Sequence, residues 1–322
     1  MPYAAAPDCP AAVVRYKREA ASQSPRAAQY VMPFADIQGI NTRYEVLGEG
    51  PPLLLLAPVG LDDSISRRWA DRVWRGFRPV ESLAPHFRVI VYDRRESGGT
   101  GGCVEPLSWK LCARHARGLL DHLEIDQAYL LGGCVGCSVA LALAAAFPER
   151  CRALLLHWPV GGFHWLSRGR ANFDRHIAFV REHGLKGVTD LARRSKMFWS
   201  DPDAGPWSSI IATNDAFAEA FVHQDPERYV RIVEESRDNL FANTLPAGAT
   251  CEQLLAMKVP AFIMPGNDVL HTTSCAQILR ELMPQATLSS LKPSQQNGTT
   301  IARWIYESTG VASAAARPGM AA

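Results

Sequence analysis

The sequence lacks the features that would assign it to a membrane, a nucleic acid or a metal centre. In its 322 residues no apolar run approaches the roughly 18 residues that a bilayer span needs. The net charge is only +2, and no basic stripe interleaves with aromatic residues, so nucleic acid is not an expected partner. Cys134 and Cys137 have Cys-x-x-Cys spacing, but no second pair accompanies them, so no zinc site is expected. These absences predict a protein with a small-molecule substrate and without a metal or cofactor.

A secretory signal and a disulfide framework are also missing. Before Arg26 the only apolar stretch is Ala11–Val14, which is too short for a signal-peptide core. Eight cysteines are scattered without the dense spacing of a disulfide scaffold, so we expect reduced thiols in a cytoplasmic protein. Residues 1–29 are predicted to be a mobile leader and residues 310–322 a disordered tail. The oligomeric state stays open.

Short apolar runs alternate with segments of helical period along most of the chain. This alternation predicts an α/β fold with a mostly parallel, doubly wound sheet and right-handed crossovers. The expected strands are residues 30–36, 40–47, 53–56, 87–92, 128–131, 153–158, 259–264 and 286–291. The expected helices are residues 69–83, 108–123, 139–146, 274–283 and 300–308.

Residues 161–250 differ in character, because they are helical in period and rich in aromatic residues. They are predicted to form a helical cap inserted into a core made of residues 30–160 and 251–309. Trp165 and Trp207 are the aromatic residues we would test first as substrate contacts. Packing within the cap is the alternative explanation for either of them.

The segment Gly132-Gly133-Cys134-Val135-Gly136 joins an apolar strand to an entirely apolar helix. This pattern predicts a nucleophile elbow with sulfur in place of the usual hydroxyl. Small residues are needed there because the nucleophile lies on a strained turn where neighbouring backbone comes close. At a helix N-terminus the Cys134 thiol should ionise more readily than an ordinary thiol. The alternative is a glycine-rich turn with a buried structural cysteine.

Several short motifs recur in a fixed order around this turn. They are the elbow, the loop after residues 53–56, Tyr92-Asp93-Arg94-Arg95, Phe147-Pro148-Glu149-Arg150, and Val259-Pro260 leading to Gly266-Asn267-Asp268. In this order and spacing the sequence resembles α/β-hydrolases of the meta-cleavage-product hydrolase and haloperoxidase-like kind over residues 30–308. The cysteine at the elbow is similar to that of the dienelactone hydrolases.

The resemblance implies roles for five positions. Cys134 matches the nucleophile, and Asp268 matches the acid that orients the base. The backbone N–H of Val135 matches one oxyanion donor, and Val59 or Gly60 should supply the second. For Asp268, an Asx turn that caps the following helix is the alternative.

The base departs from the family pattern. The family places its histidine after the last strand, but residues 292–300 contain none, and no histidine follows. His271, three residues after Asp268, is the first candidate, because a carboxylate in the same loop could fix its tautomer and raise its basicity. His157, at the end of another strand, is the second candidate and also a possible substrate contact. A surface position is the alternative for His271.

These residues predict a hydrolase or acyltransferase that forms a Cys134 acyl-enzyme. Its substrate would be a small apolar molecule with an ester, a thioester or an activated carbon–carbon bond. A non-hydrolytic protein of the same fold, such as a ligand binder, a lyase or a cofactor-free catalyst, remains open because the triad is incomplete. A redox-sensing pair of Cys134 and Cys137 is less favoured, because a bridge would distort the elbow.

Overall fold

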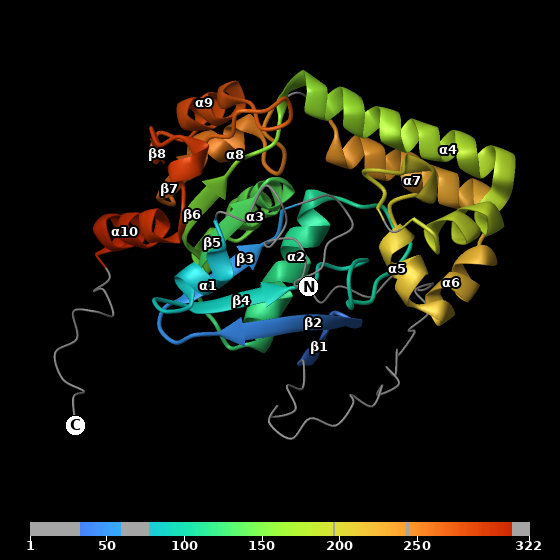
Figure 1. Ribbon diagram of the computed structural model, residues 1–322, viewed down its shortest axis with the longest axis horizontal. Helices are drawn as coiled ribbons and strands as arrows, with labels where there is room; N and C mark the ends of the chain where they lie inside the picture. The colour runs from blue at the N-terminus through green and yellow to red at the C-terminus, as the bar shows by residue number, and fades with distance from the viewer. Residues whose placement is uncertain (1–32, 59–76, 196, 243–244, 311–322) are drawn as a thin grey trace.

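The protein is seen in a computed structural model that describes residues 33–58, 77–195, 197–242 and 245–310 (Figure 1). Its strands form one eight-stranded sheet with the order β1-β2-β4-β3-β5-β6-β7-β8. Their bounds are β1 Phe34–Ile37, β2 Ile40–Leu47, β3 Pro52–Leu56, β4 Arg88–Tyr92, β5 Ala128–Gly133, β6 Cys151–His157, β7 Ala261–Met264 and β8 Ala286–Leu288. The strands β1 and β2 pair antiparallel, as do β2 and β4, and all other pairs are parallel. The predicted α/β class with a mostly parallel sheet is confirmed.

Helices cover both faces of this sheet (Figure 1). Their bounds are α1 Pro79–Leu83, α2 Trp109–His122, α3 Val135–Ala146, α4 Gly162–Ala192, α5 Ser208–Thr213, α6 Asp215–Val222, α7 Pro226–Leu240, α8 Cys251–Ala256, α9 Thr273–Leu282 and α10 Gly298–Thr309. Three 3₁₀ turns, η1 Pro148–Arg150, η2 Pro202–Ala204 and η3 Pro293–Gln295, complete the described elements.

Burial of β3 on both faces of the sheet explains its run of four leucines. Leu54 and Leu56 pack into the core on the face of α2 and α3, whereas Leu53 and Leu55 pack on the opposite face with α1 and α10. All four side chains are fully buried, because successive residues of a strand point to opposite faces and helices cover both.

Two predicted elements differ clearly from the structure. Of the predicted 69–83 helix, the structure describes residues 77–83, and within them only α1 is helical; Arg78, just before α1, has left-handed backbone (φ 40°). A residue with this φ cannot be part of a right-handed helix. The predicted 286–291 strand ends at Leu288, where β8 runs out at the edge of the sheet. The predicted leader, and the tail beyond Gly310, lie outside the described residues.

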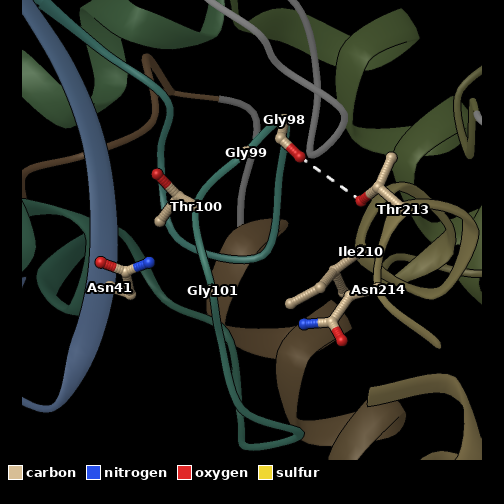
Figure 2. A pocket seen from close by; sticks show the side chains of 8 residues that line it. All are labelled: Asn41, Gly98, Gly99, Thr100, Gly101, Ile210, Thr213 and Asn214. Atoms are coloured by element: carbon tan, nitrogen blue, oxygen red, sulfur yellow. Dashed lines mark hydrogen bonds between the residues drawn. The ribbon is translucent and has the colours of Figure 1, made fainter. Parts of the chain in front are cut away.

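Helices α4 to α7 form a group beside the sheet, in the range where the sequence predicts a cap (Figure 1). This group meets the core along the segment that follows β4. Trp207 donates its indole N–H to the carbonyl of Cys103 (2.9 Å), and Ser236 accepts from the N–H of Leu107 (2.8 Å). Figure 2 shows one end of this seam, where the Thr213 hydroxyl donates to the carbonyl of Gly98 (3.4 Å).

The expectation that the cysteines are reduced thiols is wrong for Cys103, which is disulfide-bonded. Among the described residues, the cysteines outside a disulfide are Cys112, Cys134, Cys137, Cys151, Cys251 and Cys275.

Among the described helices, none combines the length and the apolar character needed to cross a bilayer.

Candidate active site

Three neighbouring strands end side by side at the carboxyl edge of the sheet. The last residue of β5, Gly133, pairs with His157 of β6, which in turn pairs with Met264 of β7. The next residues along each strand therefore begin three adjacent loops. These loops carry Cys134, Trp158 and the Asp268–His271 segment. This is the edge at which open α/β sheets form their sites.

The elbow has the strained geometry that its sequence predicts. Cys134 has φ 49° and ψ −118°, a backbone conformation that side chains rarely adopt. A Cβ on Gly132 would lie 2.5 Å from the carbonyl oxygen of Gly136, and a Cβ on Gly136 would lie 1.9 Å from the carbonyl oxygen of Leu56. Glycine is therefore the residue that fits at both positions. The half-buried Cys134 is left at the N-terminus of α3.

Asp268 and His271 share one carboxylate-centred network. The Asp268 Oδ1 atom accepts the backbone N–H groups of Leu270 and His271, both over 2.9 Å. The His271 Nδ1 atom lies 2.9 Å from Oδ1 and 2.8 Å from Oδ2. Because a carboxylate only accepts, Nδ1 carries a proton. The Asx turn proposed as the alternative for Asp268 is present, and it is what brings the ring of His271 onto the same carboxylate. The helix cap itself is Thr272, whose side chain accepts from Cys275.

The Cys134 sulfur couples electrostatically to this network. Burial lowers the pKa of His271, but the negative charge of Cys134, together with Asp268, outweighs burial and raises the pKa to about 9. The buried Nε2 atom makes no geometric hydrogen bond within the described residues, so the coupling of His271 to Cys134 is one of charge. Burial also raises the pKa of Asp268, but the His271 hydrogen bond and charge and two backbone N–H groups lower it below its usual value.

His157 lies beside this pair in a stack of aromatic rings. Its ring is parallel to that of Phe77 (centroids 4.5 Å apart) and to that of Trp158 (5.5 Å). Burial, and to a lesser degree the charge of His271, lower the pKa of His157 to about 3, so its imidazole is neutral at physiological pH. A neutral ring clamped between two aromatic rings is poorly suited to accept a proton, which favours His271 over His157 as the candidate base.

Cys137 occupies a structural position. Its thiol donates to the carbonyl oxygens of Gly132 (3.1 Å) and His157 (3.4 Å), and burial raises its pKa well above the usual value. A thiol held in this way is a poor partner for a redox pair with Cys134.

The oxyanion donors are described in part. Val135 is the first residue of α3, where the helix leaves N–H groups without a partner inside the helix. Val59 and Gly60, the predicted source of the second donor, lie outside the described residues.

Trp165 and Trp207 are both buried in the helical group. The ring of Trp165 stacks on Trp199 (5.2 Å between centroids) and contacts Phe241 (5.0 Å). Trp207 is fully buried against Tyr229 (5.5 Å). These environments are those of packing residues, and substrate contact remains a prediction for both tryptophans.

Two residues at this edge escaped the sequence analysis. Trp158 follows β6 with left-handed backbone (φ 57°), and Gln296 lies buried in the loop after β8. A buried polar residue in a loop has no periodic signal, and only the position of that loop at the carboxyl edge could have pointed to Gln296.

The described cavities lie away from this network. The cavity at the seam in Figure 2 has a volume of about 10 Å³, which is room for about one water molecule. A groove of about 580 Å³ lies between α3, α8 and the amino ends of β6 and β7, at the opposite edge of the sheet from Cys134. Within the described ranges, no three His, Cys, Asp or Glu side chains cluster closely enough to hold a metal ion.

Comparison with known proteins agrees with the fold. Residues 69–186 match the α/β hydrolase fold family. A putative carbamate hydrolase RutD from Azorhizobium caulinodans is 32% identical over 39% of this chain and 43% of its own length. The 3-oxoadipate enol-lactonase 2 of Acinetobacter baylyi is 26% identical over 80% of this chain and 87% of its own. A meta-cleavage product hydrolase from Pseudomonas fluorescens superposes with a TM-score of 0.51 at 21% identity, covering 85% of this chain and 96% of its own.

These matches differ in extent. The chain spans less than half the length of the first curated relatives that it matches, between 41% and 45%. The matched portion contains the elbow and its flanking strand and helix in the family match.

Proposed function

The chain is a member of the α/β-hydrolase fold superfamily, and from this premise we propose that it is a hydrolase that works through a covalent Cys134 acyl-enzyme. His271 would act as the general acid and base, and Asp268 would orient it. The observation that carries this proposal is the coupling of His271 to both partners: Nδ1 to the Asp268 carboxylate at 2.8 Å, and the charge of the Cys134 sulfur raising the pKa of His271 to about 9.

The first half-reaction would begin from a thiolate–imidazolium pair. The Cys134 thiolate attacks the substrate carbonyl carbon, a C–S bond forms, and the carbonyl oxygen takes the negative charge. The N–H of Val135 at the start of α3 would donate to that oxygen. When the intermediate collapses, the bond to the leaving group breaks, and the proton on His271 moves to the leaving group. His271 is then neutral.

The second half-reaction would release the acyl group to water. Neutral His271 accepts a proton from a water molecule as its oxygen bonds to the acyl carbon. The C–S bond breaks, the acid product leaves, and the thiolate–imidazolium pair is restored. A neutral base held by Asp268 through Nδ1 presents Nε2 for this step.

We infer the substrate class from three sources. The names of the relatives refer to a carbamate, an enol-lactone and a meta-cleavage product, which share an electrophilic carbonyl carbon. The cap predicted over residues 161–250 is rich in aromatic residues and favours an apolar substrate. A thiolate is most effective against carbonyl groups with a good leaving group. A small apolar ester, lactone or thioester fits all three.

Intact-protein mass spectrometry with a panel of activated esters tests the proposal. We expect a mass increase of one acyl group on the wild-type chain, located on Cys134 by peptide mapping, and none on Cys134→Ala. Cys251→Ala is the matched control, because it removes another half-buried thiol that is not in a disulfide, far along the chain, and should leave the adduct intact.

Absence of an adduct together with absence of turnover across the panel would favour a non-hydrolytic protein of this fold. An adduct on another cysteine with turnover unchanged in Cys134→Ala would overturn the role of Cys134.

A further inference from the structure

Three loops of the carboxyl edge meet at the side chain of Gln296. This residue follows η3 in the loop after β8 and is buried, with an exposed fraction of 3%. Its Oε1 atom accepts the indole N–H of Trp158 over 2.9 Å. Its Nε2 atom donates to the carbonyl oxygens of Pro265 and Leu291, both over 3.0 Å. One side chain therefore links the loops that follow β6, β7 and β8.

Only one orientation of the Gln296 amide satisfies these partners. The indole of Trp158 can only donate, and the two backbone carbonyls can only accept. A flipped amide would place N–H against N–H and oxygen against two oxygens. The three hydrogen bonds therefore fix both the position and the orientation of the Gln296 amide. A buried polar network whose groups all have partners is rigid in this way.

The residues that Gln296 holds form the walls around His271. The ring of Trp158 lies 5.6 Å from that of His271, at an angle of 53°. Pro265 begins the loop that carries Asp268 and His271. Between these walls Gly266 fits without a side chain, because a Cβ there would lie 2.5 Å from the Cβ of His271 and 3.2 Å from the Trp158 ring. The space around His271 is thus set by the relative position of Trp158 and the Pro265 backbone.

We propose that Gln296 is a positioning residue for His271: by tying Trp158 to the Pro265 carbonyl it fixes the ring of His271 between Asp268 and Cys134. This inference rests on the proposed function for its catalytic consequence but not for its geometric one. Asp268 alone holds one edge of the ring, and that carboxylate is nearly half exposed. The Trp158 face and the short Pro265–Gly266 backbone supply the second constraint, and Gln296 holds both.

The titration of His271 reports on this positioning. The charged or titratable groups that act on its ring are Cys134, Asp268 and the neutral His157. A ring that tilts away from the first two loses the charges that raise its pKa. The pKa of His271 is therefore a readout that does not require turnover.

The test compares Gln296→Ala with Gln295→Ala. Gln295 is the matched control, because it is the neighbouring glutamine, is exposed and caps only the local 3₁₀ turn. NMR titration of the imidazole C–H signals, with His271 assigned from a His271→Gln sample, should show its pKa falling in Gln296→Ala from about 9 toward 6.5. We expect kcat on a turned-over ester to fall on the order of ten- to a hundredfold, with KM little changed. Gln295→Ala should match wild type in both.

Trp158→Phe provides an independent variant, because it removes the indole donor and keeps an aromatic ring. It should lower kcat in the same direction, and the double variant should lose less than the sum of the two single losses. An unchanged His271 pKa in a folded Gln296→Ala protein would overturn the positioning role. If Gln296→Ala does not fold, an unchanged His271 pKa in Trp158→Phe would do the same. A chain that hydrolyses nothing, but in which this pKa falls, would retain the positioning role while refuting the proposed function.

Discussion

The backbone N–H of Cys134 donates to the carbonyl oxygen of His157 over 3.0 Å. This bond extends the pairing of β5 with β6 by one residue beyond the strand, into the elbow itself. The strained backbone of Cys134 is therefore held by the sheet, and the carbonyl of Cys134 in turn accepts the N–H of Cys137 (3.0 Å). A turn fixed at both ends has little freedom to absorb a larger side chain nearby.

We therefore expect Gly136→Ala to be strongly destabilising. The new Cβ would meet the carbonyl oxygen of Leu56 at 1.9 Å, and that oxygen belongs to a central strand that cannot move aside. The free energy of unfolding should fall by about 2 to 4 kcal/mol. Urea unfolding monitored by circular dichroism measures this change.

Gly101→Ala is the control, because its new Cβ would come no closer than 3.7 Å to any neighbour. Its unfolding free energy should stay within about 1 kcal/mol of wild type. Equal losses in the two variants would mean that the close approach at the elbow is not the cause.

Substitution of Cys134 tests whether its sulfur is needed for catalysis or for folding. Cys134→Ala should abolish turnover and leave the circular dichroism spectrum unchanged, since it removes one half-buried atom. Cys134→Ser should also lose most activity, because a hydroxyl is almost never ionised at neutral pH and the site would have to supply a stronger base. Steady-state kinetics on an activated ester measures both. Wild-type turnover in the alanine variant would refute covalent catalysis by Cys134.

Substitutions of Trp165 test whether its side chain only packs within the helical group or also contacts the substrate. Its contacts with the rings of Trp199 and Phe241 predict that Trp165→Ala lowers the unfolding free energy by about 3 to 5 kcal/mol. If the side chain also lines the substrate site, the ratio of kcat/KM between an aromatic and a short aliphatic ester should change in the milder Trp165→Phe variant. A large loss of stability with an unchanged ratio would assign Trp165 to packing alone.

The sequence was sufficient to predict where the strands lie along the chain and the tight turn at Cys134, because both have local signals. Four leucines in a row require a strand buried on both faces, and glycines two residues before and after Cys134 fit only a tight turn. The pairing of Asp268 with His271 was also accessible, since three residues and an Asx turn separate them.

The remaining features depend on contacts between distant residues. Gln296 is 138 residues from Trp158, and its role follows from the register of β6, β7 and β8 rather than from its own loop. The start of α1 just after Arg78 goes with a left-handed backbone at Arg78, which no residue preference predicts for arginine. No local sequence pattern encodes a contact between distant residues. The sequence of residues 292–300 therefore does not predict the role of Gln296.

His271→Gln should lower kcat/KM on the order of a hundredfold or more, within the range of general acid–base catalysis. Glutamine approximates the size of the ring but cannot exchange a proton at the position of Nε2. Asp268→Asn should have a smaller effect in the same direction, because the amide can still accept from Nδ1 but carries no charge. His157→Gln is the comparison, since a neutral stacked ring should contribute less to proton transfer. Activity within a few-fold of wild type in His271→Gln would exclude His271 as the base.

The pH dependence of kcat/KM follows from the pKa of His271. Its protonated ring stabilises the Cys134 thiolate and protonates the leaving group, so activity should persist below the pKa and fall as the pH rises through about 9. Asp268→Asn removes one of the charges that raise this pKa, so the alkaline limb should move to lower pH.

Cys134→Ala, inactive but folded, removes the larger raising cause, and NMR should then place the His271 pKa lower than in wild type. The shift in Cys134→Ala should exceed that in Asp268→Asn, because the sulfur is the stronger of the two influences. A larger shift in Asp268→Asn than in Cys134→Ala would mean that the Cys134–His271 pair does not act as a unit. So would an alkaline limb that stays in place when Asp268 or His271 is substituted, because another group would then control the pH profile.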